Sequence, residues 1–322
     1  MRLVAAVVLV AVLLLVRQAL IGPPPSTAPT GTTKVTTKAV SARIQVATAP
    51  SLTQAVEGDA AALVGSTIWV AGGLTAQGLS SAALTPYQPT TGPGPAVTLP
   101  DRLHDAAAVG LSGQLFIFGG GRFTSSAAAS AFTPPGQFTT LLNLPTPLSD
   151  LWAADVAGQL LIGGGHNSGA PNSTVWAYHP STNSYQTLLP LPVATRYAAS
   201  AVVHNTLYVI GGETQTGGSH DIIAVSTSGV SRVVAQLPVA VWKAAAGVLN
   251  GQVYIFGGKV GGSLTNTIYR FNPTTDQVSV AGHLPQPWAY GAAVSTSRGI
   301  YLLGGEGSGG TLATVYQVAL VR

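Results

Sequence analysis

The chain has 322 residues, a formal net charge of +4 at pH 7, no cysteine, and only 7% charged side chains. Four basic residues fall within the first 40 positions, and the rest of the chain holds ten basic and ten acidic side chains. Binding to nucleic acid requires clustered positive charge, so this even balance argues against a nucleic-acid partner. The absence of cysteine excludes disulfides, thiolate-bound metals and a lipid-modified cysteine.

The first predicted element is an apolar N-terminal segment. Residues 3–16 are apolar without interruption and follow Arg2. That length suits the core of a cleaved signal peptide, whereas residues 3–21 are long enough for an uncleaved anchor if Arg17 extends to the lipid headgroups. Residues 1–21 are therefore expected to be a signal sequence or a membrane anchor, and both alternatives stay open.

Residues 22–40 follow this segment and are rich in proline and threonine, with no apolar period. Such a composition is typical of an extended linker. Together the two segments predict that residues 41–322 lie outside the cytoplasm, either secreted after cleavage or anchored. Contact with the membrane is expected through the N-terminal segment only.

Residues 41–322 contain a repeat marked by pairs of glycines that each follow an apolar run. The spacings between successive pairs are 47, 45, 47, 46 and 47 residues. A period in the forties is typical of propeller blades. The six pairs are Gly72-Gly73, Gly119-Gly120, Gly164-Gly165, Gly211-Gly212, Gly257-Gly258 and Gly304-Gly305.

Each repeat predicts four strands. A run of small residues such as 106–108 suits the crowded innermost strand, and a turn such as Asn250-Gly251 favours a hairpin to the apolar second strand. An alternating third strand and a short outer strand follow, separated by a turn at residues 272–276. The sequence therefore predicts an all-β fold, a six-bladed β-propeller of four-stranded blades.

The last repeat ends after its third strand, at the end of the chain. Residues 42–48 precede the first complete repeat and have the pattern of the missing outer strand. They are expected to pair with the C-terminal blade and close the ring, which removes two open sheet edges.

The repeat resembles the kelch repeat, most closely at residues 208–212, YVIGG, and 253–258, VYIFGG. The resemblance covers residues 41–322 and implies a kelch-type propeller. Propellers of this kind serve as modules that bind proteins or carbohydrates, and a few are enzymes, so the fold does not select the function. A resemblance to galactose oxidase does not extend to its copper site, which needs a cysteine.

A candidate ligand site lies where the loops enter the first strand and leave the second strand of each repeat, because these loops share one face. The residues there include many of the charged and aromatic side chains of a chain that is poor in both. The candidate ligand-binding residues are His104, Asp105, Arg122, Asp150, His166, Arg196, Tyr197, Glu213, Trp242, Lys243, Lys259, Tyr290 and Glu306.

Two interpretations of this face remain. Trp242, Tyr197 and Tyr290 are candidate stacking platforms, and Arg196 and Lys243 are candidate clamps for an anion. Alternatively, these are the ordinary polar residues of loop tips. A binding module for a carbohydrate or a protein is expected rather than an enzyme. The alternative is a sugar epimerase or mutarotase similar to the kelch-type sialic acid mutarotase, with Glu213 as acid–base group and Arg196 as clamp.

No catalytic residue, cofactor or metal is predicted. The histidines match no standard ligand spacing. Residues 305–310 match a dinucleotide-binding pattern, but a strand follows where a helix would be needed. The small number of carboxylates predicts a stability that changes little between about pH 3 and pH 7.

Overall fold

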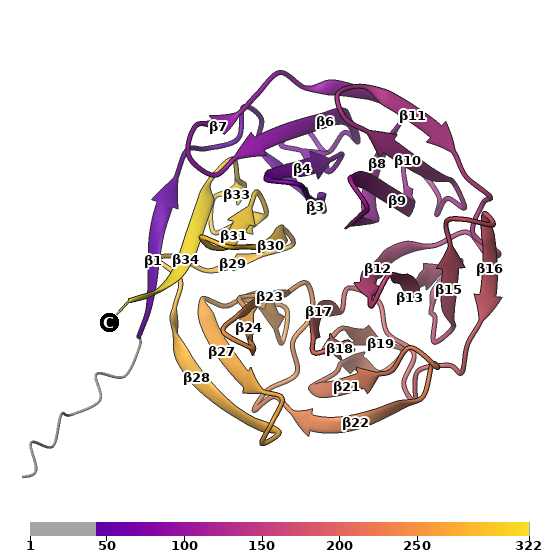
Figure 1. Cartoon of the computed structure of the whole chain (residues 1–322). Coiled ribbons are helices and arrows are strands. Elements are labelled where there is room, and N and C mark those ends of the chain that lie inside the picture. The colour runs from indigo at the N-terminus through magenta and orange to yellow at the C-terminus, as the bar shows by residue number, and fades with distance from the viewer. Residues whose placement is uncertain (1–42, 322) are drawn as a thin grey trace, which may run out of the picture. The chain divides into compact units, whose positions relative to one another are not determined.

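The computed structural model describes residues 43–321, and every regular element among them is a β-strand. The long strands form six four-stranded antiparallel units around a central axis, here called blades 1 to 6 in chain order (Figure 1). Among these residues no helix is long and apolar enough to cross a bilayer. The predicted N-terminal segment 1–21 and linker 22–40 lie outside the described residues.

Each blade runs from an innermost strand at the axis to an outer strand at the rim. The innermost strands of blades 1 to 6 are β3 (Ala60–Val64), β8 (Val97–Leu111), β12 (Ser149–Val156), β17 (Ala199–Val203), β23 (Ala245–Leu249) and β30 (Ala292–Thr296). The second strands are β4 (Thr67–Ala71), β9 (Gln114–Gly121), β13 (Gln159–Asn167), β18 (Thr206–Ile210), β24 (Gln252–Phe256) and β31 (Gly299–Leu303). The third strands are β6 (Ser81–Gln88), β10 (Ala129–Thr133), β15 (Val175–His179), β21 (Asp221–Val225), β27 (Thr267–Asn272) and β34 (Val315–Val321). The outer strands of blades 2 to 6 are β11 (Gln137–Thr140), β16 (Ser184–Thr187), β22 (Ser231–Gln236), β28 (Gln277–His283) and β1 (Arg43–Ala49).

Blades 1 and 2 are joined because β8 serves both of them. Its first part pairs with β6 as the outer strand of blade 1, as at Thr98 opposite Ala83, and its last part pairs with β9 at the axis. A Leu-Pro pair recurs five times along the chain, and its leucine lies where the chain passes from one blade to the next. In each case the leucine is buried, so it anchors the connection between neighbouring blades: Leu99, Leu144, Leu191, Leu237 and Leu284.

The hydrophobic core lies between neighbouring blades rather than within any one of them. Along β24, Val253 and Ile255 pack into the cluster shared with blade 4, while Tyr254 and Phe256 pack into the cluster shared with blade 6. Successive residues of a strand point to opposite faces, so a strand buried on both faces must be apolar throughout. One such cluster fills each of the six interfaces, including the interface between blades 6 and 1.

The paired glycines sit at the end of the second strand, where each blade contacts the next. Gly72 and Gly73 both have positive φ angles, and a Cβ at Gly72 would lie 2.4 Å from the carbonyl oxygen of Leu103. Only glycine combines this backbone conformation with so close an approach. The second glycine of every pair donates its N–H to a carbonyl of the following blade, at 2.7–2.9 Å.

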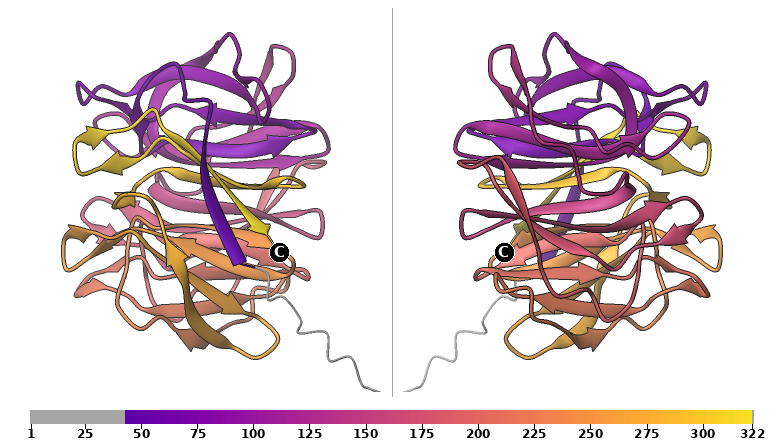
Figure 2. Two further views of the ribbon diagram at one scale, coloured as in Figure 1. Left: turned by 90° about the vertical axis from the view of Figure 1, so that its left-hand side faces the viewer. Right: turned by 90° about the vertical axis from the view of Figure 1, so that its right-hand side faces the viewer.

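The last of these inter-blade hydrogen bonds runs from Gly305 in blade 6 to Val56 in blade 1. Strand β1 also pairs antiparallel with β34 along its whole length, from Arg43 opposite Val321 to Ala49 opposite Val315 (Figure 1, Figure 2). This is the pairing that the incomplete last repeat leads us to expect of residues 42–48. It places the N-terminal strand outermost in the C-terminal blade, where it covers the edge of β34.

Candidate functional site

The site is built on a ring of six residues that occupy equivalent places where the chain enters the innermost strands. Each lies 14 residues before the first glycine of its pair, and each has a φ angle between 53° and 61°. A shared left-handed conformation is unusual for residues other than glycine and points to a common constraint. The inner ring consists of Gly58, Asp105, Asp150, Tyr197, Lys243 and Tyr290.

Backbone hydrogen bonds supply that constraint. The N–H of Asp105 donates to the carbonyl of Gly58 in the preceding blade, and the N–H of Gly58 donates in turn to the carbonyl of Tyr290. The N–H groups of Tyr197, Lys243 and Tyr290 likewise donate to the carbonyl of the ring residue in the preceding blade. The N···O distances of these five hydrogen bonds are 2.6–3.1 Å. The ring residues are thus held at fixed places around the axis.

A second ring lies just outside the first one. Each residue that precedes an inner-ring residue forms an antiparallel bridge with the residue next to its own glycine pair, as Arg196 does with Glu213 and Trp242 with Lys259. Ala289 is likewise bridged to Glu306. The inner-ring residues line the space on the axis, whereas none of the outer-ring residues does.

The inner ring surrounds a cavity of about 120 Å³ on the axis. A buried water needs roughly 10–15 Å³ of such space, so the cavity has room for several waters or a small ligand. Five predicted residues line it: Asp105, Asp150, Tyr197, Lys243 and Tyr290. Among residues 43–321, no three His, Asp or Glu side chains gather in a way that could hold a metal ion.

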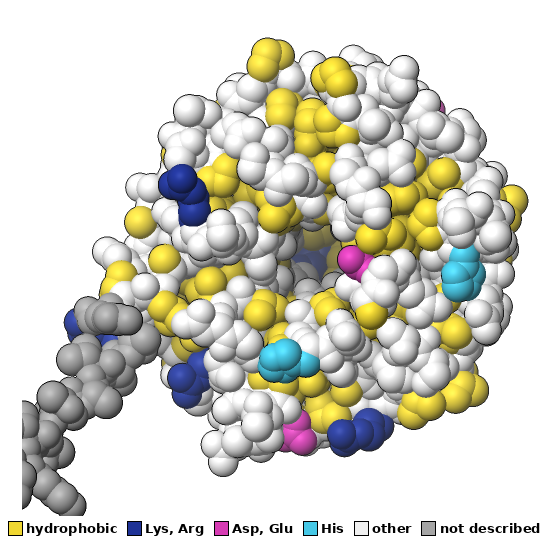
Figure 3. All heavy atoms as spheres, viewed as in Figure 1, with side chains coloured by type: hydrophobic (Ala, Val, Ile, Leu, Met, Phe, Trp, Pro, Cys, Tyr) yellow, Lys and Arg dark blue, Asp and Glu magenta, His cyan; other side chains and the backbone are white. Residues whose placement is uncertain are grey.

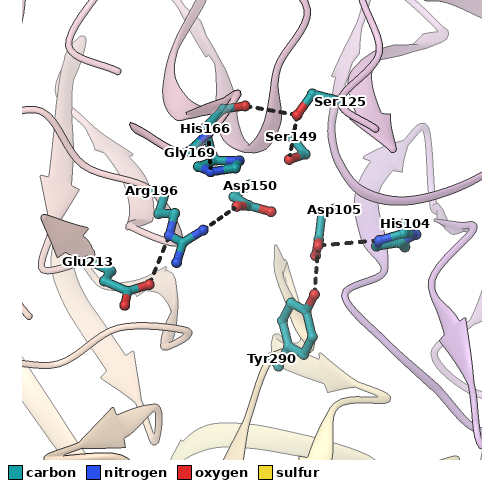
Figure 4. Close-up of polar contacts among 10 residues, drawn as sticks. All are labelled: His104, Asp105, Ser125, Ser149, Asp150, His166, Gly169, Arg196, Glu213 and Tyr290. Atoms are coloured by element: carbon teal, nitrogen blue, oxygen red, sulfur yellow. Dashed lines mark hydrogen bonds and ion pairs between the residues drawn. The ribbon is translucent and has the colours of Figure 1, made fainter. Parts of the chain in front are cut away.

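Asp105 and Asp150 form a carboxyl pair at the heart of this cavity (Figure 4). Both side chains are buried, with exposed fractions of 7% for Asp105 and 4% for Asp150. Burial raises the pKa of both groups, and the neighbouring Asp105 helps to raise that of Asp150 to about 7. At pH 7 Asp150 is therefore present in both its protonated and its ionised form, so it can act as an acid or as a base.

Tyr290 reaches the carboxyl pair from blade 6, across blade 1. Its hydroxyl donates to Oδ2 of Asp105 at 2.7 Å (Figure 4). The path crosses Gly58, where a Cβ would lie 2.7 Å from Oδ1 of Asp105 and 2.9 Å from Cζ of Tyr290. Gly58 is thus the one position of the inner ring without a side chain, and its hydrogen atom leaves room for this hydrogen bond.

Lys243 lies against the aromatic rings of the same ring of residues. Its Nζ is 3.4 Å from the ring centroid of Tyr290 and 4.5 Å from that of Tyr197, and the two tyrosines meet edge to face. Burial lowers the pKa of Lys243, and Lys259 adds to this effect, while the charge of Asp105 opposes it. The predicted stacking platforms Tyr197 and Tyr290 therefore each have a cation over the ring already.

Arg196 and Glu213 form an ion pair beside the cavity. Nε of Arg196 is 2.9 Å from Oε2 of Glu213, and Nη1 is 3.8 Å from Oδ2 of Asp150 (Figure 4). Arg196 is thus matched by carboxylates of the protein itself, and Glu213 is engaged as its partner. This arrangement leaves the carboxyl pair as the better acid–base candidate than Glu213.

The remaining predicted residues lie around the cavity rather than in its wall. His104 hydrogen-bonds to Ser80 at 2.9 Å, and burial lowers its pKa, so its 3.8 Å contact with Asp105 is polar rather than ionic at pH 7. Lys259 pairs with Glu306 at 2.8 Å. His166 accepts a hydrogen bond from the N–H of Gly169 at 3.1 Å (Figure 4).

Two predicted residues lie away from the axis. The ring of Trp242 packs against Gly218, where a Cβ would meet it at 2.9 Å, because Trp242 belongs to the outer ring. The guanidinium of Arg122 lies 4.9 Å from the ring of Phe123, which is 87% exposed. Neither Trp242 nor Arg122 lines the axial cavity.

Asp59 is a cavity residue that the sequence interpretation missed. Its carboxyl group is fully buried, and neither carboxyl oxygen has a hydrogen-bond partner. The nearby backbone groups of Asp59 and Ala292 favour the ionised form, but burial outweighs them. Burial raises its pKa to about 8, so the group is mostly protonated at pH 7. The repeat contains a signal for it, because the equivalent residues of the other blades are all uncharged: Ala106, Leu151, Ala198, Ala244 and Gly291.

The opposite end of the axis has a different character. There the inner strands surround a wider mouth of about 350 Å³, lined mainly by alanine, valine and other small side chains, with Asp155 as its one acidic residue. Figure 3 shows a hollow at the centre of the disc, bordered mostly by hydrophobic and uncharged side chains. The titratable groups around the axis are thus concentrated at the end that carries the inner ring.

Comparisons with known proteins agree with this architecture. The solved structure described as "Structure of YjhT" is similar with a TM-score of 0.74 and 16% identity, over 85% of this chain and 99% of that one. At that identity the similarity concerns the fold alone. No curated protein matches the chain. Residues 152–322 match the family model of the KLHDC2/KLHL20/DRC7 Kelch-repeats domain.

That match spans more than half of the chain, and with the fold it confirms the all-β, kelch-type propeller predicted from the spacing of the glycine pairs. The chain belongs to the family of kelch-repeat domains.

Proposed function

We propose that this protein is an extracytoplasmic binding propeller that holds a small, uncharged carbohydrate in the axial cavity. The observation that carries the proposal is the convergence of two aspartates, one lysine and two tyrosines from five blades on one cavity. Kelch-repeat propellers in general bind or interact with other molecules, and the cavity supplies the place and the chemistry for it.

The charges of the cavity favour a ligand without net charge. Raised pKa values reduce the negative charge of the wall at pH 7, because Asp59, with a pKa of about 8, is mostly protonated and Asp150, with a pKa of about 7, is partly protonated. Lys243 lies on the same wall and brings a positive charge. This charge offsets the remaining negative charge, and Arg196 is already matched by Glu213. An anion clamp, which the sequence interpretation considered, fits this balance less well than a neutral ligand does.

The hydrogen-bonding groups favour a ligand rich in hydroxyl groups. Each sugar hydroxyl both donates and accepts a hydrogen bond, and a partly protonated carboxyl group, such as that of Asp150 at pH 7, offers both roles. The cavity of about 120 Å³ has room for a small ligand, so a folded protein partner could reach only its rim.

The extracytoplasmic placement is supported by the sequence of residues 1–40, with its apolar segment and its linker rich in proline and threonine. It is tested by protease treatment of intact cells, in which a cytoplasmic protein stays protected. Degradation of the propeller from outside supports the placement, and protection until the cells are lysed contradicts it.

Carbohydrate binding is tested by calorimetry after a glycan array has identified a candidate sugar. Asp150→Asn removes the carboxyl group that titrates near neutral pH at the cavity, and Asp155→Asn makes the same change on the same strand at the opposite mouth. We expect Asp150→Asn to weaken binding by about tenfold to a hundredfold, the cost of one or two charged hydrogen bonds, and Asp155→Asn to leave it unchanged. Equal effects of the two variants, or no sugar bound at all, would contradict the proposal.

A second candidate function is a sugar mutarotase, and the carboxyl pair is the observation that favours it. To open a sugar ring, a base must take the proton of the anomeric hydroxyl and an acid must protonate the ring oxygen. Asp150, with a pKa of about 7, is present in both forms near neutral pH, and Asp105 lines the same cavity. Nuclear magnetic resonance of anomer exchange tests it. Faster exchange that Asp150→Asn abolishes supports the mutarotase, and binding without faster exchange leaves the binding module alone.

A further inference from the structure

Lys243 differs from the other described lysine in what surrounds its amine. Lys259 is held in an ion pair, with Nζ 2.8 Å from Glu306. Among the described residues no carboxylate lies within 4.0 Å of Lys243, whose Nζ rests on the faces of Tyr290 and Tyr197. Lys243 also lines the axial cavity, so its amine is available to a ligand there.

The environment of this amine favours its neutral form more than an ion pair would. Burial lowers the pKa of Lys243, and the positive charge of Lys259 lowers it further, against the attraction of Asp105 and Glu306. A lysine that is desolvated and close to another cation is an activated nucleophile, because only the neutral amine can attack carbon. Each unit by which the pKa falls raises the neutral fraction at pH 7 by about tenfold.

Groups that can donate or accept a proton line the same cavity as Lys243. Tyr290 connects this amine to the carboxyl groups, since its ring face contacts Nζ of Lys243 while its hydroxyl donates to Asp105 at 2.7 Å. Asp150 lines the same cavity, and its pKa is raised to about 7, so it is partly protonated near neutral pH. Amine, acid and base therefore meet around one space that has room for a small molecule.

We propose that Lys243 forms a reversible imine with small aldehydes, including the open-chain form of an aldose, inside the axial cavity. This inference rests on the proposed function in that it assigns the ligand class of the same cavity. The geometry that carries it is the cavity with an unpaired amine on one wall and a carboxyl pair on another. The reaction would make the site a carbonyl-capturing site as well as a sugar-binding one.

The reaction balances without any further reactant. The neutral amine of Lys243 attacks the carbonyl carbon, the C–N bond forms, and the carbonyl oxygen takes a proton from the carboxyl pair while the nitrogen returns one to it. The new hydroxyl group then takes a proton from the pair and leaves as water, as the nitrogen lone pair forms the C=N bond. The resulting iminium returns its proton to the pair, so that Asp105 and Asp150 end as they began.

Reductive trapping tests this inference on the full-length protein. Glyceraldehyde is added with sodium cyanoborohydride, whose hydride reduces an iminium to a stable secondary amine, and the modified peptides are mapped by mass spectrometry. We expect modification of Lys243 at pH 7 to be several-fold faster than that of Lys259 in the same sample, because the amine of Lys259 is held in an ion pair and that of Lys243 is not. Labelling of Lys243 that is no faster than that of Lys259 would overturn the inference.

Three variants separate the chemistry from the fold. Lys243→Arg keeps the positive charge and the contact with the tyrosine rings but cannot form an imine. It should therefore abolish labelling at this position. Its thermal unfolding temperature should stay close to that of the chain without a substitution. Asp150→Asn is expected to slow labelling of Lys243, whereas Asp155→Asn at the opposite mouth leaves the rate unchanged. Equal labelling rates in Asp150→Asn and the unmodified chain would overturn the role of the carboxyl pair.

A methyl glycoside distinguishes failure of this inference from failure of the proposed function, because it cannot open to an aldehyde. Binding of a methyl glycoside without trapping of glyceraldehyde at Lys243 would overturn the imine and leave carbohydrate binding in place. Trapping at Lys243 in a protein that binds no saccharide would support the imine and overturn the carbohydrate proposal.

Discussion

The two ends of the central channel are built by the same six strands and differ in almost every other respect. At the loop end, the inner ring brings two aspartates, a lysine and two tyrosines to a narrow cavity. At the other end, the equivalent places nine residues before each glycine pair hold Leu63, Gly110, Asp155, Val202, Val248 and Ser295 around a wider mouth. One backbone architecture thus supports a polar end with titratable groups and an end lined mainly by small side chains, and the side chains alone make the difference.

The largest effect is expected from filling the gap in the inner ring. Gly58→Ala places a Cβ against Asp105 and Tyr290 at a positive φ angle, so it should displace the hydrogen bond between these two residues. We expect the free energy of unfolding to fall by about 2–5 kcal/mol, from left-handed strain and overpacking together. Denaturant unfolding measures this change.

Gly113→Ala is the matched control for this variant. Gly113 has a φ angle of 80° in a turn, and a Cβ there meets nothing within 4 Å. The free energy of unfolding of Gly113→Ala should therefore fall only by the cost of the left-handed backbone strain, about 1–2 kcal/mol. If both variants lost the same free energy, the gap at Gly58 would have no special role.

The next effect concerns pH, and it changes the expectation of a stability that varies little below pH 7. The folded protein keeps the proton of Asp59 up to about pH 8, whereas the unfolded chain releases it near pH 4. The free energy of unfolding should therefore fall as pH rises between these values, by about 1.4 kcal/mol per pH unit for one proton. Asp105, Asp150 and Glu57, whose pKa values burial also raises, act in the same direction.

Asp59→Asn isolates the contribution of this one group. Asparagine has no proton to keep or release, so unfolding measured at about pH 5, 6 and 7 should show a slope that is shallower by about 1.4 kcal/mol per pH unit. Parallel slopes for the variant and the unmodified chain would show that Asp59 is not protonated in the folded state.

A smaller effect is expected from Tyr290→Phe. The variant keeps the aromatic face under Lys243 and loses the hydroxyl that donates to Asp105 at 2.7 Å. Loss of a buried hydrogen bond to a carboxyl group costs about 1–3 kcal/mol. Tyr178→Phe removes a hydroxyl that donates to Asn183 away from the axis, and it should leave the pH dependence of stability unchanged, unlike Tyr290→Phe.

The smallest effect is expected from Asp155→Asn at the opposite, wider mouth. Asp155 accepts a hydrogen bond from the N–H of Gly158 at 2.7 Å within a turn, and an asparagine oxygen can accept it as well. We expect a loss of at most about 1 kcal/mol in denaturant unfolding and no change in the slope with pH. A larger loss, or a changed slope, would mean that the two ends of the channel are coupled.

The sequence predicted much of this architecture because equivalent positions of a repeat occupy equivalent places in the fold. The spacing of the glycine pairs was sufficient to predict that five residues lie on one face, and these residues line one cavity: Asp105, Asp150, Tyr197, Lys243 and Tyr290. It did not separate Lys243 from Trp242, since neighbouring residues of an entering strand face different ways and only the structure shows which one faces the axis.

Burial and pairing could not be predicted in the same way. The isolated acidic position of Asp59 is visible in the repeat, but its loss of water depends on the blades packed around it. The engagement of Glu213 by Arg196 and of Lys243 by two tyrosine rings depends on side-chain rotamers, which a repeat pattern does not specify.

Because each wall of the axial cavity belongs to a different blade, the cavity depends on how many blades there are. A chain with one repeat fewer or one repeat more could keep the strands, turns and glycine pairs of every remaining blade. The distances between the inner-ring side chains across the axis would nevertheless change. Gene duplication can lengthen such a protein easily, yet this site would survive only at one copy number. Selection that maintains this cavity would therefore act on the number of repeats as much as on any single residue.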